Sequence, residues 1–377
     1  MKTKSGKSLT TRIFLVFNSL AVAGLLLVYL GVLVNPATFW PFAFAGFLYP
    51  VLFVVNVLFV LFWLIRFKAY FLISLLTILI GWEHVQSFIQ FNHTHKPLPQ
   101  EGKNIKILSY NVKVFDLYNY GPRWELNFTE RNNIFRFLQE EEFDIICFQE
   151  FVHDATGKFK TLDTLPLLVK ANRVHTVFNK SSRNINFFGL ATFSAYPIVN
   201  KGEIEFPTQM GNLCIYSDIK IGSDTIRVYN VHFESIGLSP EDYVFVESIS
   251  NPGPNFDTES FKKGGQRILN RMRKAFNHRA SQVETVMEHI QSCPYPVVLA
   301  GDFNDIPASW AYRKASGHLS DAFGSGSGMG QTYISNIPGL RIDYIFHSDE
   351  FTPYNFTTGK HNYSDHYPIW TWLYLPP

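Results

Sequence analysis

Acidic, amide and imidazole side chains follow several apolar segments of this sequence, at the points where those segments end. The apolar run "PVVL" leads into "AGDFNDIP" (residues 300–307), which carries Asp302 and Asn304. Further polar residues in comparable places are Asn111, Glu150, Asn230, His232, Asp343, Asp365 and His366. Taken alone, "GDFND" could be a turn, "SDH" could be a helix cap or loop, and His232 could be a structural histidine. Their recurrence at the ends of successive apolar segments indicates one shared site.

These residue types fit the hydrolysis of a phosphate ester, which requires neutralised phosphate oxygens, an activated water and a stabilised leaving oxygen. A hard divalent cation held by carboxylate and amide oxygens neutralises phosphate. The side chains that offer such oxygens here are those of Asn111, Glu150 and Asp365.

The remaining polar residues could handle the water and the developing charge. Asp302 and His366 are candidates for activating the water. Asp343 lies inside the apolar segment "RIDYIF", where a carboxylate is costly unless it is paired. It could therefore fix the tautomer of His366 and stabilise its charged form. The amide of Asn304 could hold the water or a phosphoryl oxygen.

A series of strands and helices downstream of residue 104 positions these side chains. Apolar and alternating segments predict strands over 104–112, 143–150, 189–198, 213–221, 224–233, 295–305, 341–346 and 369–375. Helical periodicity predicts helices over 131–142 and 278–290. Residues 237–265 are polar, contain Pro and Gly, and are predicted to form a long surface loop. This strand-rich pattern indicates two packed sheets with helices outside them.

The first hundred residues consist mainly of uncharged apolar segments. Residues 13–34 contain no charge over 22 residues, which at about 1.5 Å per residue would span a bilayer core of about 30 Å. A second run covers 39–64, and a third, 69–82, is long enough only if it extends to 91. A cleaved signal peptide is the alternative for the first run, but that run is too long. We predict a basic segment at 1–12, about three transmembrane helices within 13–91, a linker at 92–104 and a catalytic domain at 105–377.

Charge differs between these two parts. Residues 1–98 hold seven Lys and Arg and one acid, so of the 33 bases and 31 acids, 26 and 30 remain downstream, a net charge of −4. The domain therefore lacks a generally basic surface for nucleic acid, although a local basic groove is compatible with this balance. Cations at 2–12 and 66–68 predict a cytoplasmic N-terminus. Three spans would then place the domain on the outer face of the cytoplasmic membrane, whereas two would leave it in the cytoplasm. Three widely separated cysteines indicate neither a disulfide framework nor a zinc site.

Seven short segments, in this order, resemble the endonuclease/exonuclease/phosphatase superfamily of Mg²⁺-dependent phosphohydrolases. They are "SYNV", "DIICFQE", "GLATFSAYPI", "NVHFES", "AGDFNDIP", "RIDYIF" and "SDHYPI". The resemblance covers residues 105–372 and leaves the apolar region outside. It implies a DNase I-like α/β fold, in which two mixed β-sheets pack as a four-layer α/β/β/α sandwich with the site at one end of both sheets. It also implies Mg²⁺, or Mn²⁺, as cofactor.

The resemblance implies a metal site as well. Glu150 is expected to be the main metal ligand, with Asn111 and Asp365 near the metal. Two positions depart from the family pattern. Lys113 stands where many nuclease members carry an acid, and Ala195 stands where a basic residue is common. These departures put a second metal-proximal contact and one phosphate contact in doubt.

The same resemblance assigns the other polar residues to the reaction. Asp302 is expected to orient the attacking water with the help of Asn304. His366, paired with Asp343, would act as base or stabilise the phosphate. His232 would contact the scissile phosphate or assist the leaving group. The residues expected to bind substrate are Asn230, His232 and Asn304.

The sequence thus predicts a membrane-anchored, divalent-metal-dependent phosphodiesterase or nuclease. An alternative enzyme is a phospholipid or inositol-phosphate phosphodiesterase, and an alternative of another class is an inactive binding module on the same fold. None of the core residues is missing, which favours an enzyme. The expected partners are a phosphate ester (nucleic acid, phospholipid or inositol phosphate) and a lipid bilayer, with no obligate protein partner evident.

Overall fold

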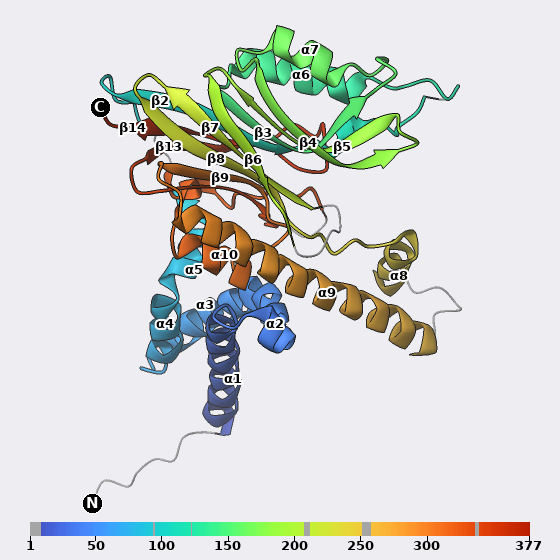
Figure 1. Ribbon diagram of the computed structural model, residues 1–377. Helices are drawn as coiled ribbons and strands as arrows, with labels where there is room; N and C mark the ends of the chain where they lie inside the picture. Colours follow the sequence, from blue (N-terminus) through green and yellow to red (C-terminus); the bar gives the residue numbers. More distant parts are fainter. Residues whose placement is uncertain (1–8, 93–94, 122, 207–211, 251–257, 336–338) are drawn as a thin grey trace, which may run out of the picture.

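The computed structural model describes residues 9–92, 95–121, 123–206, 212–250, 258–335 and 339–377. Residues 1–8 of the predicted basic segment and residues 93–94 of the predicted linker lie outside the described residues. An N-terminal group of apolar helices lies below two packed β-sheets in Figure 1, and the long helix α9 lies between these parts.

Two six-stranded mixed sheets form the centre of the domain. One has the order β13-β14-β2-β3-β5-β4 and the other β10-β12-β9-β8-β7-β6. Each contains one parallel pair, β2 with β3 and β8 with β9, and its other neighbours are antiparallel. The strands of the first sheet are β2 (Lys103–Asn111), β3 (Ile145–Asp154), β4 (Arg173–Ser182), β5 (Asn186–Ser194), β13 (Thr352–Thr358) and β14 (Ile369–Leu375). Those of the second are β6 (Ile198–Ile204), β7 (Leu213–Ile221), β8 (Asp224–His232), β9 (Val297–Asp302), β10 (Ser320–Asp321) and β12 (Asp343–His347).

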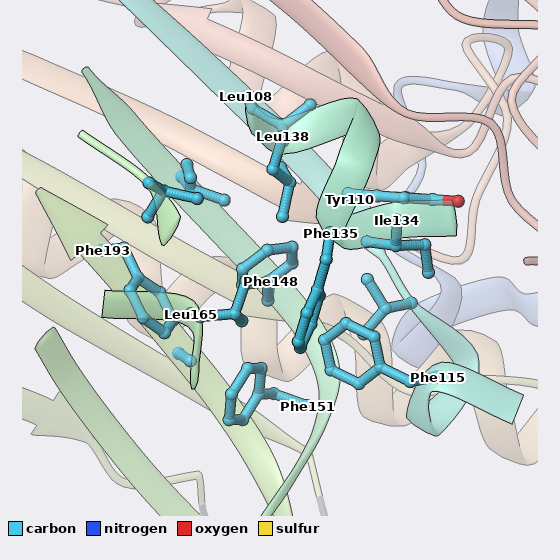
Figure 2. Close-up of a cluster of buried hydrophobic side chains, with 14 of the residues drawn as sticks. Leu108, Tyr110, Phe115, Ile134, Phe135, Leu138, Phe148, Phe151, Leu165 and Phe193 are labelled. Atoms are coloured by element: carbon cyan, nitrogen blue, oxygen red, sulfur yellow. The ribbon is translucent and has the colours of Figure 1, made fainter. Parts of the chain in front are cut away.

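Helices cover the outer face of each sheet. Helices α6 (Thr129–Glu141) and α7 (Thr161–Leu168) lie on the first sheet, over the aromatic cluster of Figure 2, where the ring centres of Phe148 and Phe151 are 5.7 Å apart. Helices α9 (Thr258–Gln291) and α10 (Trp310–Ser316) cover the second sheet. A third apolar cluster fills the space between the sheets. The predicted four-layer sandwich is confirmed.

Short elements complete the domain. They are the two-stranded sheet of β1 (Gln90–Phe91) and β11 (Ser327–Gly328), and the 3₁₀ turns η2 (Lys113–Asp116) and η3 (Ala322–Ser325).

Three predicted elements differ from the structure. The surface loop predicted over 237–265 is wrong, because helix α8 (Pro240–Ser250) and the first part of α9 occupy most of it. Side-chain ion pairs help to hold these helices together, since Arg267 and Arg271 both bind Asp242, and Phe245 packs against Phe261. The strand predicted over 189–198 is divided between β5 and β6. Strand β3 does not end at Glu150 but continues past it, after a bulge between Phe148 and Phe151.

The N-terminal region consists of α1 (Leu9–Gly31), α2 (Pro36–Phe39), the 3₁₀ helix η1 (Trp40–Leu48), α3 (Tyr49–Ile65), α4 (Phe71–Ile80) and α5 (Trp82–Phe88). Leu9–Gly31 and the combined stretch Pro36–Ile65 are long and apolar enough to cross a membrane. The third apolar run is broken, because α4 and α5 meet at an angle of 68°. A buried polar cluster links the helices, with Asn18 donating to Ser74 Oγ at 2.6 Å and accepting from Trp63 Nε1 at 3.0 Å.

The N-terminal helices pack directly on the domain. Ile306 and Ala308, which follow the "GDFND" segment, share a buried apolar cluster with Leu25 and Tyr49. Gly46 approaches this segment so closely that a Cβ there would lie 2.0 Å from the carbonyl oxygen of Ala308. The apolar helices therefore support the loop that follows β9.

Candidate active site

The strand register brings the ends of six segments to one edge of both sheets. In the parallel pairs, Asn111 ends β2 beside Gln149 of β3, and His232 ends β8 opposite Asp302 of β9. Asp343 begins β12, which runs antiparallel to β9, and it lies opposite Asp302. Asp365 and His366 precede β14, which runs antiparallel to β2, so they reach the same edge.

The backbone near this edge adopts unusual conformations. Glu150 and Asn304 have positive φ values of 52° each, in the region that non-glycine residues rarely occupy. Gly301 has a φ of 148°, and a Cβ there would lie 2.0 Å from the carbonyl oxygen of Val231. Such conformations cluster at functional sites when the surrounding structure enforces them. Here the bulge in β3 turns Glu150 toward the edge that carries Asp302.

Asp302 lies at the centre of the polar group. Its Oδ2 accepts a hydrogen bond from Asn111 Nδ2 at 3.0 Å, and its Oδ1 accepts one from the backbone N–H of Asn304 at 2.8 Å. The Nε2 atoms of His232 and His366 lie 3.6 and 3.7 Å from Oδ2. The carboxyl is 1% exposed, and burial together with the charge of Asp343 raises its pKa, against the effect of the two histidines.

His366 and Asp343 form a buried pair. Nδ1 of His366 lies 2.8 Å from Oδ2 of Asp343, and both residues are almost completely buried. Burial alone would lower the pKa of His366, but the carboxylates of Asp343 and Asp302 outweigh it and raise this pKa to about 10. The imidazole is thus charged at neutral pH, with Nε2 directed to the side of Asp302.

Glu150 and Asp365 offer carboxylates at the more open side of the site. The Glu150 side chain is 38% exposed, and its Oε1 lies 3.9 Å from His232 Nε2 and 3.4 Å from Asn111 Nδ2. Asp365 is partly buried and lines the same pocket. Asn111 presents its NH₂ group to the carboxylates, while its Oδ1 accepts a hydrogen bond from the Lys113 N–H. Asn111 would therefore bind a metal only if its amide group were flipped, so that Oδ1 faced the carboxylates.

The donor set fits a hard divalent cation. Four carboxylates, those of Glu150, Asp302, Asp343 and Asp365, reach this edge, and no Lys or Arg lines the pocket in the described part of the chain. Such an excess of negative charge would repel a phosphate unless a cation offset it. Atoms of Asp302, Asp343 and His366 also lie within 4.8 Å of one another. The direct hydrogen bond between Asp343 and His366 occupies Nδ1 and Oδ2, so the chemistry of the donors favours Glu150 and Asp365.

Two polar residues of the sequence motifs, Asn230 and Asp305, are used in hydrogen bonds or ion pairs within the protein. Asn230 is fully buried between the sheets, where its Nδ2 donates to the carbonyl oxygens of Phe148 and Ala191 and its Oδ1 accepts from Gln149 Nε2 at 2.7 Å. Asn230 thus has no surface for the substrate that it was expected to bind. Asp305 forms a buried ion pair with Arg279 of α9 at 2.8 Å.

The pocket also contains residues that the sequence motifs do not indicate. It has a volume of about 350 Å³, and its lining includes Phe47 of η1, Tyr243 of α8 and Tyr333. Tyr333 packs edge-on against His366, with ring centres 5.2 Å apart. Isolated aromatic residues in a membrane-like segment or a loop carry no chemical signal in the sequence, so only the fold could identify them.

Comparisons with known proteins agree with the fold described above. A family model described as Endonuclease/Exonuclease/phosphatase family matches residues 108–366, and a model of a domain of unknown function, DUF8431, matches residues 11–88. A stretch of 231 residues is 26% identical to "Carbon catabolite repressor protein 4 homolog 1" of Arabidopsis thaliana, covering 54% of this chain. The match spans only 36% of that relative's length.

Solved structures share the fold at low sequence identity. A functionally unknown conserved protein from Enterococcus faecalis has a TM-score of 0.50 and 14% identity, over 72% of this chain and 100% of that one. The human Nocturnin catalytic domain with bound sulfate has a TM-score of 0.49 and 16% identity, over 72% and 94%. A mannosyl-6-phosphatase of Bacteroides thetaiotaomicron has a TM-score of 0.47 and 16% identity, over 71% and 99%.

Proposed function

The chain belongs to the endonuclease/exonuclease/phosphatase family, and we propose that it is a membrane-anchored hydrolase of phosphate esters that depends on a divalent metal, Mg²⁺ or Mn²⁺. The observation that carries this proposal is the buried cluster at Asp302. Two imidazole nitrogens lie 3.6 and 3.7 Å from one carboxylate oxygen, and one of the imidazoles is paired to Asp343. This cluster joins the catalytic groups that the family resemblance predicts.

The metal would be held by Glu150 and Asp365, with Asn111 beside them. When bound, the cation would neutralise the phosphate oxygens and polarise the phosphorus centre. Local structure would hold the side-chain oxygens of these residues in place. The bulge of β3 positions Glu150, and the hydrogen bond from Ser364 Oγ to the Asn111 carbonyl joins β2 to the segment that carries Asp365.

Asp302 and Asn304 would orient the attacking water, and Asp302 would receive its proton. Water oxygen then bonds to phosphorus as the bond from phosphorus to the leaving alcohol breaks. His366 is charged, so we assign it to stabilising a phosphoryl oxygen through Nε2 rather than to accepting a proton. His232 lies 3.6 Å from Asp302 and would protonate the leaving oxygen.

The test is turnover of bis-p-nitrophenyl phosphate by the full chain in detergent micelles. The full chain is needed because its N-terminal helices pack on the loop after β9. Activity should require Mg²⁺ and disappear with EDTA. Asp302→Ala should lower kcat by about 10³-fold or more, since it removes the water-orienting group. Asp349→Ala, an exposed acid of the same domain, is the matched control and should retain activity. Absence of metal-dependent turnover, or full activity of Asp302→Ala, would overturn the proposal.

We also propose that the apolar helices anchor the chain in the cytoplasmic membrane, with the domain on its outer face. The far ends of α1, α3 and α4 would lie on the cytoplasmic side, because Arg66 and Lys68 join α3 to α4. A reporter enzyme that is active only outside the cytoplasm tests this topology. Fused at the C-terminus it should be active, and fused after Lys68 it should be silent. Silence of both fusions would mean that the third segment does not cross the membrane, and it would place the domain in the cytoplasm.

A further inference from the structure

We propose that the substrate of this site is a phosphate ester held in the membrane by an apolar tail, and that it enters the pocket from the lipid side. This inference rests on the proposed hydrolysis at Asp302 and names the substrate class for it. The net reaction adds one water across one P–O ester bond and yields an alcohol and a phosphate product.

The pocket is lined by both polar and apolar side chains. We call the apolar part of this lining the apolar wall. The members of this apolar wall are Phe47, Ile236, Leu238, Ile306, Leu340 and Ile342. A hydrophobic lining with a few convergent polar groups is typical of a site that binds a partly apolar molecule. A sugar-phosphate backbone has no chemical need for such a wall, whereas an alkyl or prenyl chain does.

The apolar wall is continuous with the N-terminal helices. Ile306, Leu340 and Ile342 pack on the apolar cluster that these helices form. Phe47 belongs to η1 and is 38% exposed, and Leu48 and Val51, which follow it in the chain, are more exposed still. Exposed apolar residues at the start of α3 therefore follow directly on a residue that lines the pocket. A lipid tail bound at these residues would reach the pocket at Phe47.

Helix α9 carries positive charge beside the same helices. Residues 258–274 contain six Lys and Arg and one acid, and two of these bases, Arg267 and Arg271, pair with Asp242. The helix packs on η1 through Phe44 and Phe276, whose ring centres are 5.2 Å apart, and Arg273 lies over the ring of Trp40 at 5.5 Å. In Figure 1, α9 passes directly above α2 and continues to α8. Basic residues and a tryptophan at the end of apolar helices match the headgroup layer of an anionic membrane.

Helix α8 adds apolar side chains at the pocket mouth. Tyr243 lines the pocket, and Val244, Val246 and Ile249 on the same short helix are all exposed. Asp242 fixes this helix to α9 through Arg267 and Arg271. Exposed apolar side chains of this kind favour contact with lipid. Residues of η1 and of α8 thus both line the pocket.

The experiment compares two diesters that share one leaving group, hexadecyl p-nitrophenyl phosphate and methyl p-nitrophenyl phosphate. The full chain is assayed with Mg²⁺ in micelles of a phosphate-free detergent. We expect kcat/KM for the hexadecyl ester to exceed that for the methyl ester by about 100-fold or more, because each buried methylene contributes to binding. Phe47→Asn should lower the ratio of the two kcat/KM values by about 10-fold, and Phe47→Leu should restore most of it.

Leu48→Asn is the matched control. Leu48 lies on the same exposed surface but does not line the pocket, so this variant should keep the wild-type ratio. A thermal unfolding scan of each variant identifies any that fails to fold, and Phe47→Leu then keeps the test decisive.

The outcomes separate this inference from the proposed function. Metal-dependent turnover of the methyl ester, with no preference for the hexadecyl ester, would overturn the lipid inference and leave the hydrolase intact. An equal loss of preference in Leu48→Asn and Phe47→Asn would overturn it too, since the effect would then reflect the micelle rather than the pocket. A single-stranded oligonucleotide cleaved faster than the hexadecyl ester would identify a nuclease instead. No turnover of any ester would refute the proposed function itself.

Discussion

Replacing Arg279 by Met should destabilise the protein strongly, because it leaves the carboxylate of Asp305 buried without its partner. The side chains are 1% and 8% exposed, and Arg279 Nη1 lies 2.8 Å from Asp305 Oδ2. At an effective dielectric of about 20, two charges at this separation attract by about 6 kcal/mol, before the cost of removing both from water. Removing one member of such a buried pair typically costs about 3–5 kcal/mol.

A double-mutant cycle isolates the pair. Asp305→Asn alone should also destabilise, because it leaves the guanidinium of Arg279 buried without a carboxylate. The double variant contains neither charge, so it should lose less stability than the two single variants together, by about 2 kcal/mol or more. Met fills most of the space of the Arg279 side chain, and Asn fills that of the Asp305 side chain. The amide oxygen at position 305 can still accept the hydrogen bond from the backbone N–H of Ile306.

The measurement is thermal unfolding of the full chain in detergent, followed by tryptophan fluorescence. At about 2 °C per kcal/mol, the lower end for large domains, Arg279→Met should lower Tm by about 6–10 °C. Lys263→Met on the same helix is the control. It breaks an exposed pair with Glu259, and such pairs contribute about 0.5 kcal/mol or less. Losses that add without coupling in the double variant would refute the buried-pair reasoning, as would equal Tm values for Arg279→Met and Lys263→Met.

Three further outcomes follow from the site and the core. Asp343→Asn should lower kcat by about 10³–10⁴-fold, because it removes the carboxylate that orients and charges His366. A loss under tenfold in folded protein would contradict that role. Glu150→Gln should raise the Mg²⁺ concentration for half-maximal activity by about 10-fold or more, measured by metal titration after EDTA treatment; an unchanged titration would exclude it as a ligand. Burial lowers the pKa of His175 to about 4 from 6.5. Between pH 4 and 6.5, His175 is therefore protonated in the unfolded chain but not in the folded protein. The free energy of unfolding should then fall as the pH drops from 6.5 to 4. His175→Asn should show a smaller fall in Tm over this range.

Most of the site could be predicted because strand ends place residues in a regular way. Parallel neighbours end at the same edge of a sheet, and an antiparallel neighbour begins there. Asn111, His232 and Asp302 end their strands, as the apolar patterns indicate, whereas Asp343 was expected inside a strand and instead begins β12. Glu150 reaches the same edge by a different route, because β3 bulges there and runs on. Sequence patterning does not reveal a bulge of this kind.

Asn230 shows a second limit of the sequence. It precedes His232 by two residues on the same strand, so both side chains face the opposite sheet. One step along the strand separates a residue at the rim from one in the core. At the deeper position, the Asn230 amide is used entirely for hydrogen bonds between the sheets. The type and spacing of residues cannot show this difference in depth, because it depends on where the second sheet ends.

The apolar N-terminal helices were predicted as a membrane anchor, and their packing on the domain gives them a second role. Ile306 and Ala308 continue directly from the Asp302–Asn304 segment, and Ile342 directly precedes Asp343. All three pack on the N-terminal cluster, so the helices and both catalytic segments share one apolar core. An active site positioned to about half an ångström depends on the residues that support its loops. Removing the helices would therefore expose this core and loosen the loops that carry Asp302 and Asp343. Some of the same residues line the pocket, so the proposed anchor and the proposed route of the substrate share one set of side chains.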